Sequence, residues 1–230
     1  MTDIHSHLLP SVDDGGYNLR QSLEKLKAMS LSGVSKVILT PHDFDGERKN
    51  TPEFLTERFN AFTDQVKNAG IEIKLYLGEE IAFDKSFYRQ KDGFLTLAES
   101  KALLVEFPTV QNYDIADDVY NLAAMGFKPI VAHVERYGVA FNGAYLEEIK
   151  SAGGFTQINA DTVLKRRGES AYKKCVKFIK SGLIDFVASD THKFRTPSLK
   201  AAELVVVKKC GEEAAANLFY KNAEKIIFNS

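Results

Sequence analysis

Cysteine is scarce in this chain, which has only Cys175 and Cys210 among its 230 residues. The two do not form a Cys-x-x-Cys pair, and they are too few for the disulfide framework of a small secreted domain. Two isolated thiols in a chain of this length are typical of a reducing compartment. We therefore expect a cytoplasmic protein in which both cysteines are packing residues.

Long apolar runs and a signal peptide are also lacking. The longest apolar runs, such as Leu204 to Val207, are much shorter than the roughly 20 residues that a membrane-spanning helix requires. The chain begins Met-Thr-Asp-Ile-His, without the basic region and apolar stretch of a secretory signal. These absences predict that the protein does not insert into a membrane.

Charge of one sign is not in excess either. The formal net charge is −1 and the sequence pI is about 6.5. No overall basic field therefore favours nonspecific binding to nucleic acid or to an anionic membrane, and any recognition of anions must be local. We expect no nucleic-acid partner.

Proline-rich linkers, low-complexity blocks and long runs of like charge are absent as well. With 44% hydrophobic and 27% charged residues, the chain can bury one substantial core. The sequence therefore predicts a single domain over residues 1–230.

Short β-branched runs alternate with longer segments of helical period, which is typical of βα units around a parallel sheet. The predicted strands are 3–5, 36–40, 71–78, 102–107, 128–132, 156–159 and 186–188. The predicted helices, apolar at spacings of three and four, are 19–31, 52–69, 115–125, 144–152, 170–181 and 199–209. Five glycines suited to left-handed helix ends lie between a helix and the next strand: Gly33, Gly70, Gly126, Gly153 and Gly182. The pattern predicts an α/β fold with helices outside the strands.

All five histidines lie in or directly after a predicted strand: His5, His7, His42, His133 and His192. In a barrel of parallel strands the carboxyl ends open on one face, so these side chains are expected to converge there. Carboxylates recur at the same kind of position: Asp14, Glu80, Glu106 and Asp190. A single histidine near a strand end is more often a structural or surface residue than a ligand, but the joint pattern favours a shared site.

Such a set is costly to bury without countercharge, and divalent cations remove that difficulty. Imidazole and carboxylate ligands together suit zinc, manganese or iron, and the lack of cysteine argues against a structural thiolate site. Three divalent ions with four carboxylates would leave about two positive charges, which suits a phosphate dianion. The sequence therefore predicts two or three divalent metal ions.

The clearest local signatures are pairs of ligands two residues apart. His5 and His7 would point to the same face of an extended strand and chelate one ion, and Asp190 and His192 repeat this spacing. The turn that follows His7 contains Asp13 as an alternative to Asp14. Spacing alone also does not separate Glu79 from Glu80.

These segments resemble the PHP (polymerase and histidinol phosphatase) superfamily, and within it the bacterial tyrosine-protein phosphatases of capsule and exopolysaccharide operons, the CpsB/YwqE type. The resemblance rests on Asp3-Ile4-His5-Ser6-His7, Val12-Asp13-Asp14-Gly15, Thr40-Pro41-His42, Gly78-Glu79-Glu80-Ile81, Val105-Glu106-Phe107, Ala132-His133-Val134-Glu135-Arg136-Tyr137 and Ser189-Asp190-Thr191-His192. It implies a distorted (β/α)7 TIM-like barrel, the PHP fold, with a trinuclear centre that manganese often activates.

Carried over by position, the resemblance implies one ion held by His5, His7, Glu80 and Asp190. Glu80 would bridge to a second ion bound by Glu106 and His133, and a third would take Asp14, His42 and His192. The family's catalytic arginine matches Arg136. Its second arginine falls on Arg195, in a segment shorter than the family's usual loop.

The predicted reaction is hydrolysis of phosphotyrosine on a protein, by a metal-activated hydroxide with the two arginines on the phosphate. By resemblance, the partner would be a tyrosine autokinase that controls polysaccharide export. Neither cysteine heads a Cys-x5-Arg loop, so no thiol nucleophile is expected. Tyr137, Phe44 and Phe83 are candidates to line a pocket for the aromatic ring, although aromatic residues near a barrel rim are more often part of the core.

Three alternatives stay open from the sequence. One is a PHP phosphoesterase acting on a small molecule such as histidinol phosphate or a nucleotide. Another is a non-catalytic PHP module, although such modules usually lose ligands and every ligand position is filled here. The third is a metal-dependent amidohydrolase, which would usually bring a lysine at a strand end, where the sequence offers no candidate.

Overall fold

The computed structural model describes residues 1–15, 18–45, 48–89, 93–109, 113–138, 141–194 and 198–229. The strands are β1 (Thr2–Asp3), β2 (Lys36–Leu39), β3 (Phe44–Asp45), β4 (Arg48–Lys49), β5 (Lys74–Leu77), β6 (Glu80–Ala82), β7 (Ala102–Glu106), β8 (Lys128–Val131), β9 (Phe155–Asn159) and β10 (Phe186–Ala188). The α-helices are α1 (Leu19–Leu31), α2 (Pro52–Asn68), α3 (Ile115–Ala124), α4 (Gly143–Ser151), α5 (Ala160–Val163), α6 (Glu169–Lys180), α7 (Leu199–Cys210) and α8 (Glu212–Ala216). Short 3-10 segments are η1 (Lys85–Arg89), η2 (Leu97–Glu99) and η3 (Val134–Arg136), and π-helical turns form η5 (Asn217–Lys221) and η6 (Glu224–Phe228).

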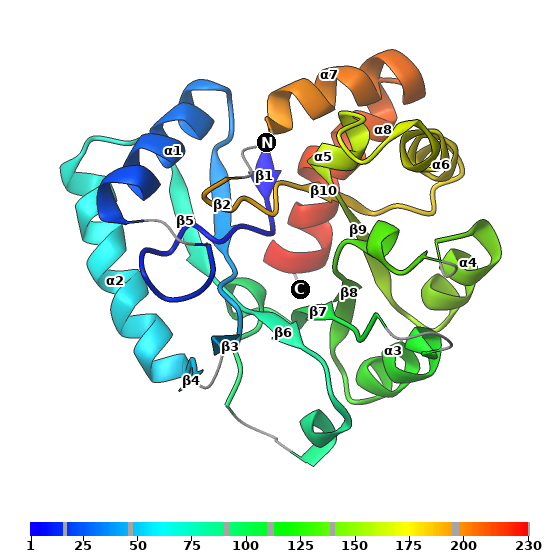
Figure 1. Ribbon diagram of the computed structural model, residues 1–230, viewed down its shortest axis with the longest axis horizontal. Helices are drawn as coiled ribbons and strands as arrows, with labels where there is room; N and C mark the ends of the chain where they lie inside the picture. The colour runs from blue at the N-terminus through cyan, green and yellow to red at the C-terminus, as the bar shows by residue number, and fades with distance from the viewer. Residues whose placement is uncertain are drawn as a thin grey trace.

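The strands form two parallel sheets with helices around them (Figure 1). One sheet has the order β1-β2-β5 and the other β10-β9-β8-β7-β6, while β3 and β4 make a separate antiparallel pair. Two isolated parallel bridges link the sheets, Ser6 with Thr191 and His42 with Glu80. The predicted α/β architecture with parallel strands is confirmed.

Alternate residues of each strand face two different cores, as the two-residue period of a strand requires. On β2, Ile38 belongs to an inner core, whereas Val37 and Leu39 belong to an outer core beneath the helices. The inner core comprises Ile4, Ile38, Leu97, Ala102, Leu104, Ile130, Ala132, Phe186, Ala188, Ala223, Ile226 and Ile227. The strands are therefore apolar on both faces, which explains their nearly continuous apolar sequences.

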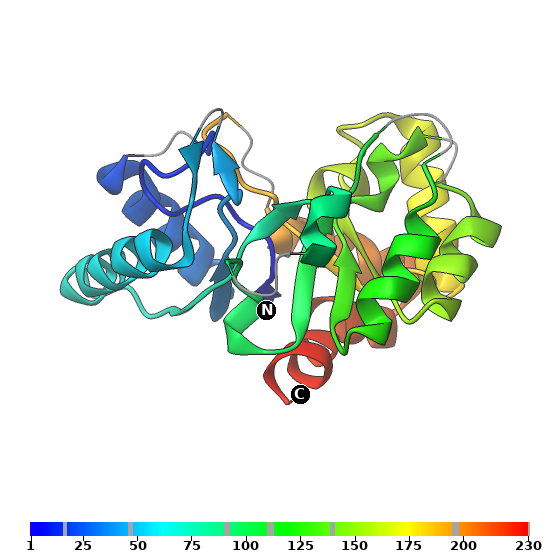
Figure 2. The same cartoon turned by 90° about the horizontal axis from the view of Figure 1, so that it is seen from below.

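The C-terminal segments η5 and η6 lie at the end of the inner core where the strands begin. Lys128, the first residue of β8, donates from Nζ to the Ile226 carbonyl at 3.1 Å, and Asn222 donates to the Asp185 carbonyl, just before β10, at 2.8 Å. In Figure 2 both chain termini lie at this end, which we call the floor. The carboxyl ends of the strands open at the opposite end.

Most predicted elements are present, and the differences have local causes. The predicted strand 71–78 is present only as β5, at Lys74–Leu77, and β6 at Glu80–Ala82 was not predicted. Gly78 lies between them, where a Cβ would lie 2.7 Å from Leu97 Cδ2. Helices α5 and α8, the β3-β4 pair and the C-terminal turns were not predicted. All five helix-terminal glycines have the positive φ that was expected of them. In the described part of the chain, no helix has the length and apolar character needed to cross a membrane.

Candidate metal centre

The structure brings all nine predicted ligand residues together, most of them at or just after the carboxyl ends of strands. His5 and His7 follow β1, His42 follows β2, Glu80 begins β6, Glu106 ends β7, His133 follows β8, Asp190 and His192 follow β10, and Asp14 lies on the loop before α1. Their ligand atoms form three groups, each within 4.8 Å: His5, His7 and Asp190; Glu80, Glu106 and His133; and His7, Asp14, His42 and His192. Residues far apart in sequence thus converge, as the fold predicts.

Glu80 lies at the centre of the cluster. Its Oε2 is 3.1 Å from Nε2 of both His5 and His7, and its Oε1 is 2.8 Å from His133 Nε2. Oε2 also lies 3.3 Å from His42 Nδ1, so one carboxylate faces imidazoles of all three groups. Glu79 instead accepts a hydrogen bond from the backbone N–H of Leu95 at 2.5 Å, so the structure distinguishes two residues that spacing could not.

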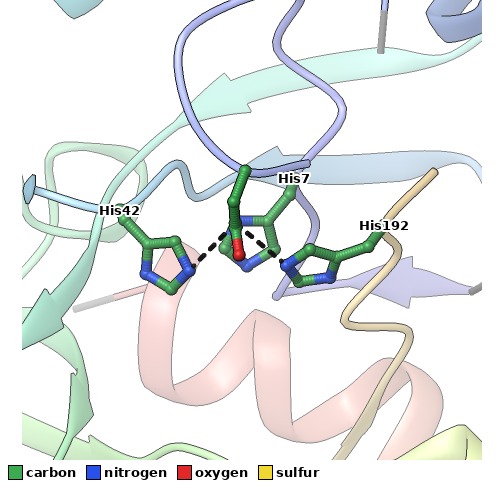
Figure 3. Close-up of side chains that lie close together, drawn as sticks. His7, His42 and His192 are labelled. Atoms are coloured by element: carbon green, nitrogen blue, oxygen red, sulfur yellow. Dashed lines mark ion pairs between the residues drawn. The ribbon is translucent and has the colours of Figure 1, made fainter. Parts of the chain in front are cut away.

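The third group lies on the more open side of the cluster. Asp14 Oδ1 is 3.4 Å from His42 Nε2 and 3.3 Å from His192 Nε2. Figure 3 shows these two imidazoles and His7 around the dashed ion pairs, and the rings of His7 and His192 are stacked at 4.2 Å. The side chain of Asp14 is 67% exposed, so this group borders solvent.

Asp13 supports the ligands from behind. Its Oδ2 lies 2.7 Å from His7 Nδ1 and accepts the backbone N–H of His42 at 3.2 Å, while its Oδ1 accepts the N–H of Gly15 at 3.0 Å. The contact at Nδ1 leaves His7 Nε2 directed toward Glu80. Asp13 and Asp14 therefore have different positions, one behind a ligand and one among the ligands.

The electrostatics of the cluster fit divalent cations. His5 Nε2 and His7 Nε2 are 3.1 Å apart in a fully buried setting, with Glu80 Oε2 equally close to both. Burial alone would raise the pKa of Glu80, but the surrounding imidazoles outweigh it and hold that pKa well below its usual range. Burial likewise opposes protonation of His5, yet Glu80 and Asp190 raise its pKa. Buried carboxylates thus demand positive charge, which metal ions can supply in place of protons.

Two of the ligand residues hold strained backbone. His133 has a φ of 32° and Asp190 a φ of 48°, in the left-handed region that side chains with a Cβ rarely adopt. Each lies two residues after the end of its strand, β8 or β10. Strain of this kind concentrates at functional sites, where neighbouring contacts hold it in place.

Arg136 lies beside the cluster, on the turn η3 that follows His133. Its Nη2 donates to Asp190 Oδ2, and its Nη1 is 3.7 Å from Glu106 Oε1. The side chain is only partly exposed, so the guanidinium contacts two of the predicted ligands. Arg195, the second predicted arginine, lies outside the described residues.

Gln157 and Asn159, both on β9, are buried beside the cluster and were not predicted. Gln157 Oε1 is 3.2 Å from His5 Nδ1 and accepts the backbone N–H of His133 at 2.8 Å. Asn159 Nδ2 donates to Asp190 Oδ2 at 2.5 Å. A signal was present in the sequence, since two amides at alternate positions of a strand face the same side.

The prediction that three aromatic residues line a substrate pocket is wrong for two of them. Tyr137 and Phe83 are both buried in the outer core, and the Tyr137 hydroxyl accepts the backbone N–H of Phe107 at 2.9 Å. They pack the wall behind the cluster, as aromatic residues near a barrel rim usually do. The side chain of Phe44 lies outside what the structure describes.

Comparison with known proteins shows which family this chain resembles. The family model described as capsular polysaccharide synthesis, CpsB/CapC, matches residues 1–228. The tyrosine-protein phosphatase CpsB of Streptococcus pneumoniae is 31% identical over 240 residues, covering 100% of this chain and 99% of the relative. The tyrosine-protein phosphatase YwqE of Bacillus subtilis (strain 168) is 29% identical over 235 residues, covering 100% and 92%.

Solved structures include one of the same type of phosphatase. A structure from work on YwqE of Bacillus subtilis and CpsB of Streptococcus pneumoniae, described as unique metal-dependent tyrosine phosphatases, matches with a TM-score of 0.91. It is 29% identical, and the match covers 100% of this chain and 95% of that one. A phosphotriesterase from Mycobacterium tuberculosis matches with a TM-score of 0.64 at 12% identity, covering 98% and 93%, and shows a shared fold alone.

Proposed function

Because the chain belongs to the CpsB/CapC family of capsular polysaccharide synthesis, we propose that it is a metal-dependent tyrosine-protein phosphatase. The predicted resemblance to the CpsB and YwqE type is confirmed by relatives that match the whole chain. Both relatives are named tyrosine-protein phosphatases. The sequence predicted the same activity, hydrolysis of phosphotyrosine on protein. A tyrosine autokinase of the same polysaccharide system is the substrate we propose.

The proposed architecture is one PHP domain over residues 1–230, with a distorted seven-stranded barrel. The two isolated bridges between the parallel sheets support this, since they lie where a barrel would have to close. The cluster would hold two or three divalent ions, with manganese as the activating metal. One ion would take His5, His7, Glu80 and Asp190; a second Glu80, Glu106 and His133; and a third Asp14, His42 and His192.

Bound divalent ions would supply Lewis acidity for the phosphoryl oxygens and a lowered pKa for water. The chain's own residues supply position and charge. Arg136 lies at the edge of the ligand set, where its planar fork can bind phosphoryl oxygens or neutralise the leaving phenolate. We propose the same role for Arg195 from the segment after His192.

The observation that carries this proposal is the placement of Glu80, whose two oxygens face imidazoles of separate groups. A carboxylate between two ligand groups is the arrangement that lets adjacent ions act on one phosphate. Neither cysteine takes part: Cys175 is buried in the outer core, where burial raises the pKa of its thiol well above the usual range. Chemistry by a thiolate nucleophile is therefore not supported.

The test is hydrolysis of a phosphotyrosine peptide by protein that has been stripped with a chelator and reloaded with Mn²⁺. We expect manganese-dependent release of phosphate, with kcat/KM well above that for a phosphoserine peptide or histidinol phosphate. Preference for histidinol phosphate or a nucleotide would instead identify a small-molecule esterase. Absence of turnover on every substrate, with metal bound, would identify a non-catalytic module.

Ligand variants provide the control for this test. His5→Ala and Asp190→Ala should lose metal and activity together, because each removes a buried ligand from the centre of the cluster. Elemental analysis of each variant measures the bound metal directly. Full metal stoichiometry in either variant would contradict the ligand assignment.

A further inference from the structure

Gln157 connects residues that belong to different ligand groups. Its side chain is fully buried on β9, between the turn of His133 on one side and the ring of His5 on the other. His5 and His133 lie in different groups, yet one amide oxygen contacts both. The amide is therefore placed to fix the relation between the two groups.

The direction of every hydrogen bond around Gln157 follows from one backbone group. The N–H of His133 can only donate, so the atom that it meets at 2.8 Å must be the amide oxygen Oε1. The same oxygen lies 3.2 Å from His5 Nδ1, and because Oε1 only accepts, His5 must carry its proton on Nδ1. In the neutral ring, His5 Nε2 then carries the lone pair that a metal ion would take, on the side of Glu80 and His7.

The other end of the amide extends the chain of bonds to a third ligand. Gln157 Nε2 donates to Asn159 Oδ1 at 2.9 Å, which orients Asn159 so that its Nδ2 donates to Asp190 Oδ2 at 2.5 Å. Arg136 donates to the same carboxylate oxygen. Asp190 Oδ1 then faces His5 and His7, each at 3.6 Å.

Gln157 also holds strained backbone in place. The residue that donates to it, His133, has a φ of 32°, and such a conformation persists only where surrounding contacts fix it. Loss of this acceptor would leave a buried N–H unsatisfied and release the turn that carries both His133 and Arg136.

We infer that Gln157 is a positioning residue that couples the metal sites: it sets the tautomer of His5, holds the turn of His133 and, through Asn159, orients Asp190. This inference deepens the proposed function and rests on it only in that the ligands bind divalent ions. Partners behind metal ligands usually change affinity about 10- to 100-fold when removed.

The test compares Mn²⁺ binding by three variants of the chelator-stripped protein, using titration calorimetry. Gln157→Leu removes the acceptor and the donor, and we expect affinity to fall about 10- to 100-fold. Gln157→Glu keeps an oxygen that accepts from both His133 and His5 but loses the donor to Asn159, so we expect its affinity to lie between those of Gln157→Leu and the original protein. Equal affinity for Gln157→Leu and the original protein would overturn the inference.

Thr156→Val is the matched control on the same strand. Thr156 is also fully buried, but its hydroxyl donates to the Leu183 carbonyl at 2.6 Å, away from the cluster. This variant should lower thermal stability and leave Mn²⁺ affinity unchanged. If it weakened binding as much as Gln157→Leu, a general loss of packing on β9 would explain both, and the inference would fail.

The absorption spectrum of bound Co²⁺ gives a readout that a purely structural role would not change. We expect the ligand-field bands of Gln157→Leu to shift, because His5 and His133 lose their fixed orientation, and those of Thr156→Val to match the original protein. Should Gln157→Leu not fold, Gln157→Glu carries the test, because it removes the donor to Asn159. Mn²⁺ affinity and Co²⁺ bands identical to those of the original protein would then overturn the inference. All these measurements are independent of turnover, so failure of the proposed phosphatase activity would be seen separately.

Discussion

Arg136 contacts Asp190 and approaches Glu106, so under the proposed function its guanidinium lies within reach of a phosphoryl group bound at these residues. We expect Arg136→Ala to reduce kcat on a phosphotyrosine peptide by roughly a hundredfold or more, as for loss of a positioned transition-state contact. Metal content should not change, because Asn159 still holds Asp190. Steady-state kinetics with elemental analysis measures both quantities.

Arg20→Ala is the control for this variant. Arg20 lies on α1, is largely exposed and pairs with Glu24 at 3.0 Å on the same helix. Its removal should leave turnover unaltered, since exposed pairs of this kind contribute little. Unaltered turnover in Arg136→Ala as well would remove the proposed role of that arginine.

At the scale of single residues, the sequence predicted which side chains would lie together. It did not predict which of two adjacent carboxylates would face the cluster. His5 and His7 were predictable because the strand period puts them on one face. Asp13 and Asp14 were not separable, because their roles depend on the fold of the turn after Val12, where only one carboxylate lies against His7 Nδ1. Spacing cannot carry that information.

The loop from His7 to α1 depends on a close backbone approach at Gly15. A Cβ there would lie 2.3 Å from the His7 carbonyl oxygen and 2.8 Å from His7 Cβ. We expect Gly15→Ala to displace His7 and weaken Mn²⁺ binding by about tenfold or more, as changes near a ligand do. Titration calorimetry on the stripped protein is the measurement.

Gly143→Ala serves as the comparison. The added Cβ at the start of α4 would meet Phe178 Cε1 at 3.6 Å, an ordinary contact. Metal affinity should be unchanged in this variant. If Gly15→Ala also bound Mn²⁺ normally, the loop would have room to shift without moving His7.

The floor contributes to stability through the inner core, to which η6 supplies Ile226 and Ile227. Ile227 is buried among Ile4, Ile38 and other inner-core residues. We expect Ile227→Ala to lower the free energy of unfolding by about 2 to 4 kcal/mol, through lost burial and the cavity left behind. Urea unfolding measures the change.

Leu204→Ala is the matched control for the floor. Leu204 is 58% exposed on α7, so its truncation should change the free energy of unfolding by less than about 0.5 kcal/mol. A similarly small change in Ile227→Ala would show that the floor is not part of the cooperative core.

At the scale of elements, the long helices were predictable because their apolar periodicity is sustained over several turns. The segment from Glu212 to Phe228 was not, because it is divided into short α and π turns whose apolar residues are shared between the outer core, with Leu218 and Phe219, and the inner core, with Ile226 and Ile227. The two amides of β9 were missed for a similar reason. Their role appears only once His5 and His133 are brought against the strand.

For the molecule as a whole, metal should act as a stabilising ligand. A ligand at about a thousand times its Kd stabilises the folded state by about 4 kcal/mol, and each kcal/mol moves the Tm of a chain this size by about 2 to 4 °C. We therefore expect chelation to lower the Tm by about 10 °C. Scanning fluorimetry with EDTA, followed by return of Mn²⁺, measures this shift.

His5→Ala is the control here, because a protein that has lost a central ligand should respond much less to EDTA. A Tm of the original protein that is insensitive to both EDTA and Mn²⁺ would contradict stabilisation by bound metal. The experiment measures metal binding by the whole set of predicted ligand residues, and it needs no substrate.

The described C-terminal segment η6 ends at the floor, on the side of the molecule away from the imidazoles. A tag or surface linker attached after it would hold the protein with its reactive face turned outward. Immobilised on a sensor chip in this way, the enzyme should still meet a bulky phosphorylated protein as readily as it does free in solution.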